Sequence, residues 1–302
     1  MAREAITLKT VNDEVMHGFA WNIVEPKGNV VIVTGMEEYL LRYEDFALFL
    51  NSKGYNVCGI DQYGQGSNCP NEDDLGIVPN SSFSKMVRNI DDLVKRVKKN
   101  GLPTYVFAHS MGSFMLQDYI QRFPNSADKV VICGTNGPNA KLAYKFGYPL
   151  AKMVCKFKGE HKTAKLLASL AVGGYAKSIK DRKTMVDWLS YNDENNQKYL
   201  NDPYCGHAST NGFYRELLKG NRRLYNKKFM VKIRKDLPAF IIAGDEDPVG
   251  AKGKGPTLLA DLYKKYGLTN VELKIYPKMR HEILNELNKK VVYDDIANFL
   301  AK

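Results

Sequence analysis

The stretch Thr104-Tyr-Val-Phe-Ala-His-Ser-Met-Gly-Ser-Phe114 determines how the rest of the chain is interpreted. Its first four residues are β-branched or aromatic, which predicts a buried strand. From Phe114 to Arg122 the spacing of side chains is helical. Ser110 stands between the two elements, with the small residues Ala108 and Gly112 two positions to either side. A serine at so sharp a strand-to-helix turn is a nucleophile elbow.

The small flanking residues of this elbow have a steric cause, because a large side chain at either position would clash in the turn. Ala108 stands where the motif usually has glycine, and as the next smallest residue it should be tolerated. The Met111 N–H lies at the start of the helix, where it can help to hold an oxyanion. The alternative is that Ser110 only caps the helix, so its partners elsewhere in the chain decide between the two interpretations.

Length and composition set the class of protein. A chain of 302 residues with 44% hydrophobic content fits one large α/β domain or one domain with an insertion. No apolar run approaches the ~20 residues that span a bilayer, and no hydrophobic signal region stands at the start. We expect a cytoplasmic protein with free thiols, because its cysteines are odd in number and lack metal-ligand spacing: Cys58, Cys69, Cys133, Cys155 and Cys205.

The positive charge is concentrated in one segment. Residues 141–183 contain eleven lysines and arginines against two acids, so they carry +9 of the net charge of +11. The rest of the chain is nearly neutral, which argues against a nucleic-acid partner.

Strand and helix patterns alternate along most of the chain. They predict a mostly parallel sheet of eight strands with helices on both faces, the first strands being antiparallel. From about residue 134 to 235 only helical periodicity appears. We therefore expect a core of residues 1–135 and 236–302, with a helical lid at 136–235 inserted after the sixth strand. The predicted strands cover residues 4–9, 15–23, 29–33, 56–60, 104–107, 129–133, 238–243 and 271–276.

Two further side chains are expected at the strand ends beside Ser110. His281 follows the eighth strand and is the candidate base, and Asp247 follows the seventh and is the candidate acid. The order serine, aspartate, histidine is that of an α/β-hydrolase. Asp245 competes with Asp247, but Pro248 fixes the turn after Asp247, which we prefer. The other histidines are weaker candidates, His109 because its side chain should point away from the serine: His17, His109, His161 and His207.

A second oxyanion donor is expected in the loop after the third strand. Met36 follows Gly35 there, so its N–H is our choice beside that of Met111. For the substrate pocket itself we expect Gly35, Phe146 and Leu150.

Several motifs together resemble the lysophospholipase and monoacylglycerol-lipase branch of the α/β-hydrolases, over almost the whole chain. They are Thr34-Gly-Met-Glu-Glu38, Arg42-Tyr-Glu-Asp-Phe46, Asp61-Gln-Tyr-Gly-Gln-Gly66, Trp188-Leu-Ser190, Asp202-Pro-Tyr-Cys-Gly206, Gly244-Asp-Glu-Asp-Pro-Val-Gly250 and Tyr276-Pro-Lys-Met-Arg-His-Glu-Ile-Leu-Asn285. The resemblance implies a triad of Ser110, Asp247 and His281 and a lid over the site. The chemistry of such a triad needs no cofactor or metal. Four residues depart from the family pattern, none in the triad: Thr34, Tyr63, Gln65 and Ala108.

Glu38 and Arg42 match that pattern, and we expect them to form a charge pair that orders their loop. In the lid, an apolar stripe lies among lysines. We expect its apolar side to cover the pocket, although a basic amphipathic helix can also make transient contact with an anionic membrane. The stripe consists of Leu142, Phe146, Leu150, Met153, Val154 and Phe157.

These features favour a serine esterase that acts on lipid-like monoacyl esters through an acyl-enzyme on Ser110. Two alternatives stay open. One is a ligand-binding protein of the same fold that lacks turnover, prompted by Thr34 and Ala108. The other is an aminopeptidase of the same fold, which would need an acidic pocket for a free amine. A dehalogenase would carry aspartate at position 110 and is excluded.

Overall fold

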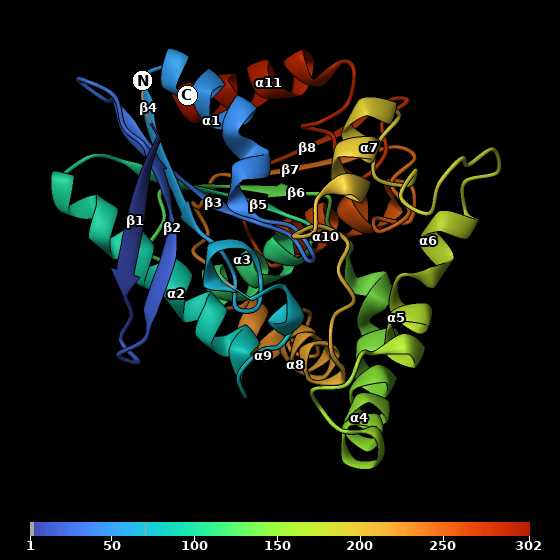
Figure 1. Cartoon of the computed structure of the whole chain (residues 1–302). Helices are drawn as coiled ribbons and strands as arrows, with labels where there is room; N and C mark the ends of the chain where they lie inside the picture. The colour runs from blue at the N-terminus through green and yellow to red at the C-terminus, as the bar shows by residue number, and fades with distance from the viewer. Residues whose placement is uncertain (1–2, 70) are drawn as a thin grey trace.

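The computed structural model describes residues 3–69 and 71–302. Met1 and Ala2 lie outside the described residues. They begin the segment in which we expect no signal region. Eight strands form one sheet in the order β1-β2-β4-β3-β5-β6-β7-β8 (Figure 1). The strands are β1 (Arg3–Lys9), β2 (Val15–Trp21), β3 (Gly28–Val33), β4 (Tyr55–Ile60), β5 (Thr104–His109), β6 (Lys129–Cys133), β7 (Ala239–Gly244) and β8 (Val271–Tyr276).

The sheet is mostly parallel, as the sequence predicts. β2 pairs antiparallel with β1 and with β4, and every pairing from β4 to β8 is parallel. The carboxyl ends of the parallel strands therefore meet at one edge, which is where α/β sheets bind ligands. All six residues of β3, β5 and β7 are buried, because helices cover both faces.

Two helical layers cover this sheet (Figure 1). Alternate residues of β3 point to opposite faces, so Val30 and Ile32 pack with α1 and α11 while Val31 and Val33 pack with α2, α3 and α10. The layers are formed by α1 (Glu44–Ser52), α2 (Ser82–Val97), α3 (Met111–Arg122), α10 (Lys254–Lys265) and α11 (Lys289–Ala301). The described residues also form short 3₁₀ helices: η1 (Leu40–Tyr43), η2 (Gly66–Asn68), η3 (Glu72–Asp74), η4 (Lys98–Asn100) and η5 (Pro138–Ala140).

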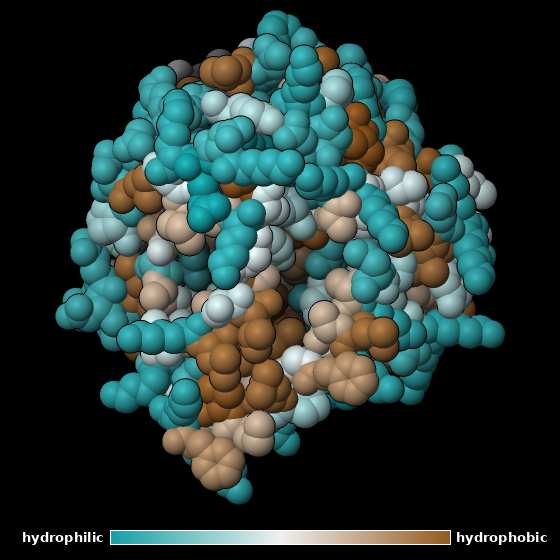
Figure 2. Space-filling model, turned by 90° about the vertical axis from the view of Figure 1, so that its right-hand side faces the viewer, coloured by the Kyte–Doolittle hydropathy of each residue, from teal (hydrophilic) through white to brown (hydrophobic). Residues whose placement is uncertain are grey.

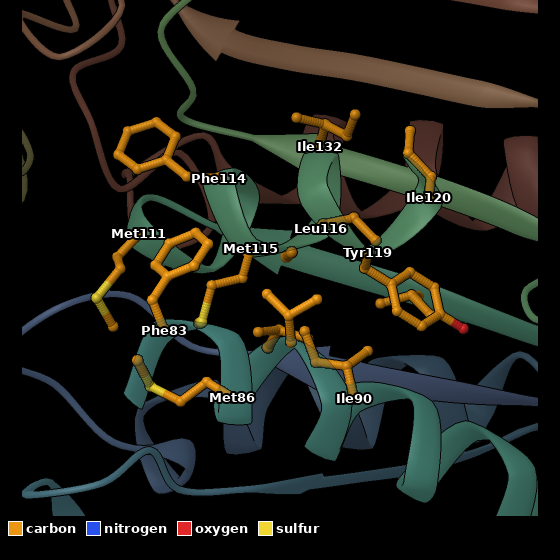
Figure 3. Close-up of a cluster of buried hydrophobic side chains, with 14 of the residues drawn as sticks. Phe83, Met86, Ile90, Met111, Phe114, Met115, Leu116, Tyr119, Ile120 and Ile132 are labelled. Carbon is orange, nitrogen blue, oxygen red and sulfur yellow. The ribbon is translucent and has the colours of Figure 1, made fainter. Parts of the chain in front are cut away.

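The packing of α2 against α3 fixes the helix that follows Ser110. Phe83, Met86 and Ile90 recur at helical spacing on α2 and turn toward Met115 and Tyr119 of α3 (Figure 3). All five side chains are buried. Burial of one such side chain contributes roughly 1.5–3 kcal/mol, so α3 is held firmly beneath the elbow.

Only helices and turns join β6 to β7 within the described chain, apart from one isolated bridge between Thr163 and Thr210. α8 packs against α4, α2 and α3, and α9 packs against α3. No helix of the described residues has both the length and the apolar character that a bilayer crossing needs. The helices are α4 (Lys141–Lys158), α5 (Lys165–Ala171), α6 (Gly173–Lys177), α7 (Asp193–Asn201), α8 (Asn211–Asn221) and α9 (Lys227–Met230).

The orientation of α4 differs from the expectation that its apolar stripe covers the pocket. Four of the six stripe residues are exposed on the surface: Leu142 (64%), Phe146 (67%), Met153 (52%) and Phe157 (75%). The inner face of α4 carries Tyr144, Ala151 and Val154, which are buried. α4 packs against α8, where Gly147 lies against Leu218, so the large side chains of the stripe are left on the outer face.

Candidate active site

Ser110 stands at the tip of the turn from β5 to α3, as the elbow motif predicts. Its φ of +52° and ψ of −120° are strained for a residue with a side chain. Its N–H donates to the Cys133 carbonyl oxygen at 3.0 Å, which holds the turn against β6. A Cβ at Gly112 would lie 2.4 Å from the Val33 carbonyl oxygen, so only glycine fits there. Ala108 is fully buried between β3 and β6, and the turn accommodates its methyl group.

Asp247 and His281 meet at the same edge of the sheet. The Asp247 Oδ1 lies 3.0 Å from Nδ1 of His281, and it also accepts the Val249 N–H at 2.9 Å. Both side chains are buried. Asp245, the competing acid, donates its backbone N–H to the Tyr276 carbonyl oxygen and is not the carboxylate paired with His281.

The electrostatics of this pair favour a basic imidazole. Burial alone would lower the pKa of His281, but the charge of Asp247 and its hydrogen bond to Nδ1 outweigh it, so the pKa lies above its ordinary value. An imidazole whose Nδ1 is held by a carboxylate keeps Nε2 free to accept a proton.

The turn that follows β6 contacts both the Ser110 turn and the imidazole of His281. Cys133 accepts the Ser110 N–H, and the next residue, Gly134, lies against the imidazole. A Cβ at Gly134 would be 3.1 Å from Cε1 of His281 and 2.9 Å from Cε1 of His109. A glycine is therefore needed at this position to leave room for both rings.

His109 has a contact that the sequence does not predict. Its ring lies 4.6 Å from that of His281 between centroids. Burial and the nearby His281 lower the pKa of His109 well below its ordinary range, so this second ring stays neutral. The remaining histidines lie elsewhere: His17 is on β2, His161 is exposed beside Glu160, and His207 is in the loop before α8.

In the loop after β3, one backbone N–H of a residue that lines the cavity has no acceptor among the described residues. The Gly35 N–H donates to Oε1 of Glu38 at 2.5 Å, and the Glu37 N–H donates to Oε1 of Gln65 at 2.8 Å. Between them, the Met36 N–H makes no hydrogen bond to another described residue. The Gln65 amide also donates to the Gly35 and Glu38 carbonyl oxygens, each at 3.1 Å. Gln65, one of the four departures, thus orders the predicted oxyanion loop.

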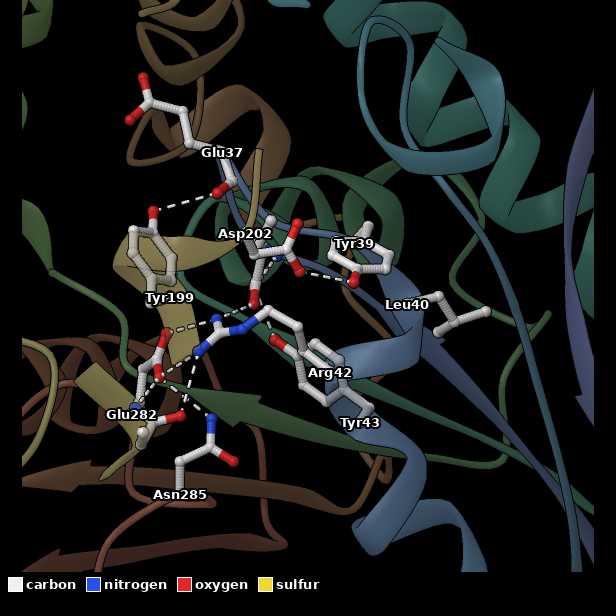
Figure 4. Close-up of polar contacts among 12 residues, drawn as sticks. Glu37, Tyr39, Leu40, Arg42, Tyr43, Tyr199, Asp202, Glu282 and Asn285 are labelled. Carbon is white, nitrogen blue, oxygen red and sulfur yellow. Dashed lines mark hydrogen bonds and ion pairs between the residues drawn. The ribbon is translucent and has the colours of Figure 1, made fainter. Parts of the chain in front are cut away.

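Arg42 connects this loop to the segment that carries the histidine (Figure 4). Its guanidinium binds Oε2 of Glu38 at 2.9 Å and both carboxylate oxygens of Glu282 at 2.6 and 2.7 Å. Burial alone would raise the pKa of Glu282, but Arg42 outweighs it and lowers the pKa to about 2. The expected pairing of Glu38 with Arg42 is confirmed, and Glu282, next to His281, completes the network.

A cavity of about 440 Å³ opens at Ser110 and is lined by Met36 and Met111 as well. Its other walls are mostly apolar, and among the described residues that line it none is charged. Figure 2 shows apolar surface gathered around a hollow on the side of the molecule where α4, α5 and α6 lie. Further lining residues are Phe114, Tyr144, Leu150, Leu167, Leu170, Tyr175, Trp188, Tyr214, Leu217, Leu218, Asn221 and Val249.

Of the three pocket residues expected from the sequence, only Leu150 lines this cavity. Phe146 lies on the outer face of α4, and Gly35 lies next to Ser110, where a Cβ would be 3.1 Å from the serine Cβ. A second, polar depression of about 940 Å³ lies between α1 and α7 and is lined by neither Ser110 nor His281.

Several residues that line the cavity have no sequence signal that predicts a role in the site. Trp188 appears only within a motif of the resemblance, and Tyr175 and Tyr214 give no local signal, because contacts between α6, α8 and the site depend on how the helices pack. The described residues contain no group of three or more histidines, cysteines, aspartates or glutamates that could hold a metal ion.

A strained serine turn on a sheet of this order, beside a buried aspartate–histidine pair, defines an α/β-hydrolase. Residues 24–288 match the family described as serine aminopeptidase, S33, and the chain belongs to that family.

The individual relatives of this chain have low sequence identity to it. The chain is 26% identical to a monoacylglycerol lipase of Mycolicibacterium smegmatis, over 92% of this chain and 89% of the relative. It is 22% identical to a phospholipase of Bacillus subtilis, over 91% of this chain and 95% of the relative. Among solved structures it is similar to a thermostable carboxyl esterase from Bacillus coagulans, with a TM-score of 0.91, 24% identity and coverage of 100% and 98% of the two chains.

Proposed function

We propose that this protein is a serine hydrolase that cleaves carboxylic esters of lipid-like monoacyl substrates. The observation that carries the proposal is the uncharged, mostly apolar cavity of about 440 Å³ that opens at Ser110. A volume of this order suits a small organic ligand, and the walls favour an acyl chain. The names of the lipase and phospholipase relatives support the same substrate class.

In the proposed mechanism, His281 removes the proton from Ser110 as the serine oxygen attacks the ester carbonyl. Asp247 holds the imidazole through Nδ1 and stabilises its charge. The N–H groups of Met36 and Met111 stabilise the tetrahedral oxyanion. Protonated His281 then gives its proton to the departing alcohol. Water, activated by the same imidazole, releases the acid from Ser110.

The helices that border the cavity are proposed as its lid, within the predicted insertion 136–235. Residues from α4 and α5 line the cavity, whereas α9 packs on α3 of the core. We propose that the protein is cytoplasmic. Its five cysteines support this location, because all of them are free thiols.

The family is described as serine aminopeptidase, S33, so an aminopeptidase is one alternative function. A free amino group is a cation, and burying a cation without a counter-charge is costly. The described residues offer no carboxylate in the cavity wall, so an ester is the better substrate. Hydrolysis of p-nitrophenyl esters from acetate to laurate, compared with aminoacyl p-nitroanilides, separates the two activities. Faster turnover of the anilides would contradict the ester proposal.

A binding protein without turnover is the other alternative. It would show a thermal shift with monoacyl ligands and no release of p-nitrophenol.

A series of monoacylglycerols and lysophospholipids, varied in chain length, defines the preferred head group and acyl length of the substrate. Leu150→Trp should shift the preference to shorter chains, because Leu150 lines the cavity. Phe146→Trp is the matched control and should leave the preference unchanged, because Phe146 is on the outer surface.

We also propose that the outer face of α4 makes transient contact with an anionic lipid surface. Its four exposed apolar side chains lie among five exposed lysines, and none of those lysines forms an ion pair with a described residue. Apolar insertion and electrostatic attraction act together at such a surface. The apolar residues are Leu142, Phe146, Met153 and Phe157, and the lysines are Lys141, Lys145, Lys152, Lys156 and Lys158.

Co-sedimentation with vesicles tests this contact. Wild-type protein should sediment with phosphatidylglycerol vesicles and less with phosphatidylcholine vesicles. Phe146→Ser with Phe157→Ser should weaken the binding, whereas Leu287→Ser, which changes an exposed leucine (74%) outside α4, should not. Equal binding of all variants would contradict the proposal.

A further inference from the structure

Trp188 packs its indole against the imidazole of His281. The ring centroids are 5.1 Å apart and the planes are inclined by 34°. The indole also lines the cavity and has Tyr175 packed on it, with centroids 5.1 Å apart. The proposed mechanism assigns no role to Trp188, although it touches the one side chain that changes charge in every step.

The backbone around Trp188 is fixed to the segment that carries His281. The Trp188 carbonyl oxygen accepts the His281 N–H at 3.4 Å, and the Leu189 carbonyl oxygen accepts the Glu282 N–H at 2.7 Å. The Arg280 guanidinium donates to the Asp187 carbonyl oxygen at 2.6 Å. These contacts on both sides of the tryptophan hold its ring beside the imidazole.

We propose that Trp188 is a positioning residue that acts through His281, its indole face stabilising the imidazolium by a cation–π interaction. Tryptophan is the strongest aromatic partner for a cation, and contacts within about 6 Å of the ring centroid are effective. The imidazolium forms in both the acylation and the deacylation steps, so its stabilisation would lower both barriers. This inference rests on the proposed role of His281 as the base.

Other charged and titratable groups also lie near the imidazole. Asp247 approaches from the loop after β7, neutral His109 from β5, and Glu38, which is paired with Arg42, from the turn before η1. Glu282 is the neighbour on the histidine's own segment. Substitution of Trp188 leaves all of these in place, so a change in the pKa of His281 reports the indole.

The sign of that change separates two roles for the indole. If Trp188 only excludes water, its removal exposes the imidazole, favours the cation and raises the pKa of His281. If its π face stabilises the cation, removal lowers the pKa. Trp188→Phe keeps a weaker aromatic face, and Trp188→Leu keeps apolar bulk without one.

The first experiment measures kcat/KM for a p-nitrophenyl ester against pH. We expect the acid-limb pKa to fall in the order wild type, Trp188→Phe, Trp188→Leu, by roughly half a unit to one unit in the leucine variant. At the pH plateau we expect kcat to fall roughly 3- to 10-fold in that variant, the factor that corresponds to the same loss of interaction with the imidazolium. A rise in the acid-limb pKa, or no change, would overturn the proposal.

The second experiment does not depend on turnover. The chain has two tryptophans, and Trp21 is buried on β2, so Trp21→Phe leaves Trp188 as the single indole fluorophore. A protonated imidazole in contact quenches indole emission, so the emission should rise with pH through the pKa of His281. The transition should persist in Ser110→Ala and disappear in His281→Gln. If Trp21→Phe does not fold, the wild-type minus Trp188→Phe difference gives the same signal.

The two experiments distinguish failure of this inference from failure of the proposed hydrolysis. A His281-dependent fluorescence transition without any ester turnover would contradict the hydrolase and leave the ring contact standing. If the protein hydrolyses esters but shows neither a fluorescence transition nor a shifted acid limb, the role proposed for Trp188 is contradicted and the hydrolase function is not.

Discussion

Arg42 binds both carboxylate oxygens of Glu282, at 2.6 and 2.7 Å, and so ties the turn beside the proposed oxyanion loop to the residue next to His281. Both side chains are buried, and Glu38 shares the same guanidinium. One planar cation thus fixes two segments that are 240 residues apart in the sequence. This contact holds the proposed oxyanion loop and the segment of His281 together.

Arg42→Met should therefore destabilise the protein strongly, because it leaves two buried carboxylates without a counter-charge. Removing one partner of a buried ion pair costs about 3–5 kcal/mol. Lys289→Met is the matched control: it breaks the more exposed pair with Asp45, for which a loss of about 0–1 kcal/mol is expected. Urea unfolding followed by circular dichroism measures both. Equal losses in the two variants would contradict the role given to Arg42.

Asp247→Asn should abolish most of the activity and move its pH dependence. In the free enzyme His281 must be neutral to act as a base, and its pKa is raised above the ordinary value of 6.5, so kcat/KM should rise with pH through an acid limb above 6.5. Loss of the Asp247 charge lowers that pKa and leaves the imidazole poorly held. A loss of roughly 10⁴-fold in kcat is expected, as in other serine triads.

Asp245→Asn is the control for that variant, because Asp245 lies two residues away and is not the carboxylate paired with His281. Its kcat should stay within a few-fold of wild type. If Asp245→Asn were the inactive variant, the acid assigned from the sequence and the geometry would be wrong.

Gln65→Leu should lower kcat more than it raises KM. The change removes the three hydrogen bonds that order the loop carrying Met36, so the oxyanion donor loses its fixed position. Loss of a whole oxyanion donor costs on the order of 10²–10³ in kcat, which sets the upper bound. Gln121→Leu changes another buried glutamine, on α3, and should reduce stability while the folded protein keeps its kcat.

Glu37 should make the folded protein less stable as the pH rises. Burial raises its pKa to about 7 from 4.5, although Ser209 donates a hydrogen bond to its carboxylate at 2.8 Å. The folded state therefore binds more protons between pH 4.5 and 7, and stability falls over that window. Glu37→Gln removes this titration, so its melting temperature relative to wild type should be higher at pH 8 than at pH 5. The same difference at both pH values would contradict the assignment.

The sequence was sufficient for the fold and for the elbow, because those features have local signals. Strand periodicity predicts all eight strands, and β6 and β8 have the predicted bounds. The small residues around Ser110 predict the turn. The partnership of Asp247 with His281 is also predictable, since the carboxyl ends of parallel strands meet at one edge.

Contacts between helices could not be predicted in the same way. An amphipathic stripe does not show which neighbour it faces. The stripe therefore predicts Phe146 in the pocket, whereas the structure has it on the surface. The contacts of Trp188 and His109 with the His281 ring arise only when distant segments pack together. Gln65 is a departure from the family pattern whose bonds become visible only in three dimensions.

Labelling with a fluorophosphonate probe tests whether Ser110 is the nucleophile. Wild-type protein should gain one probe adduct, mapped by peptide mass spectrometry to Ser110, and should lose ester hydrolysis in proportion to labelling. Ser110→Ala should stay unlabelled while keeping its fold. An adduct on another residue, or an unlabelled wild-type protein that hydrolyses no p-nitrophenyl ester from acetate to laurate, would contradict the account.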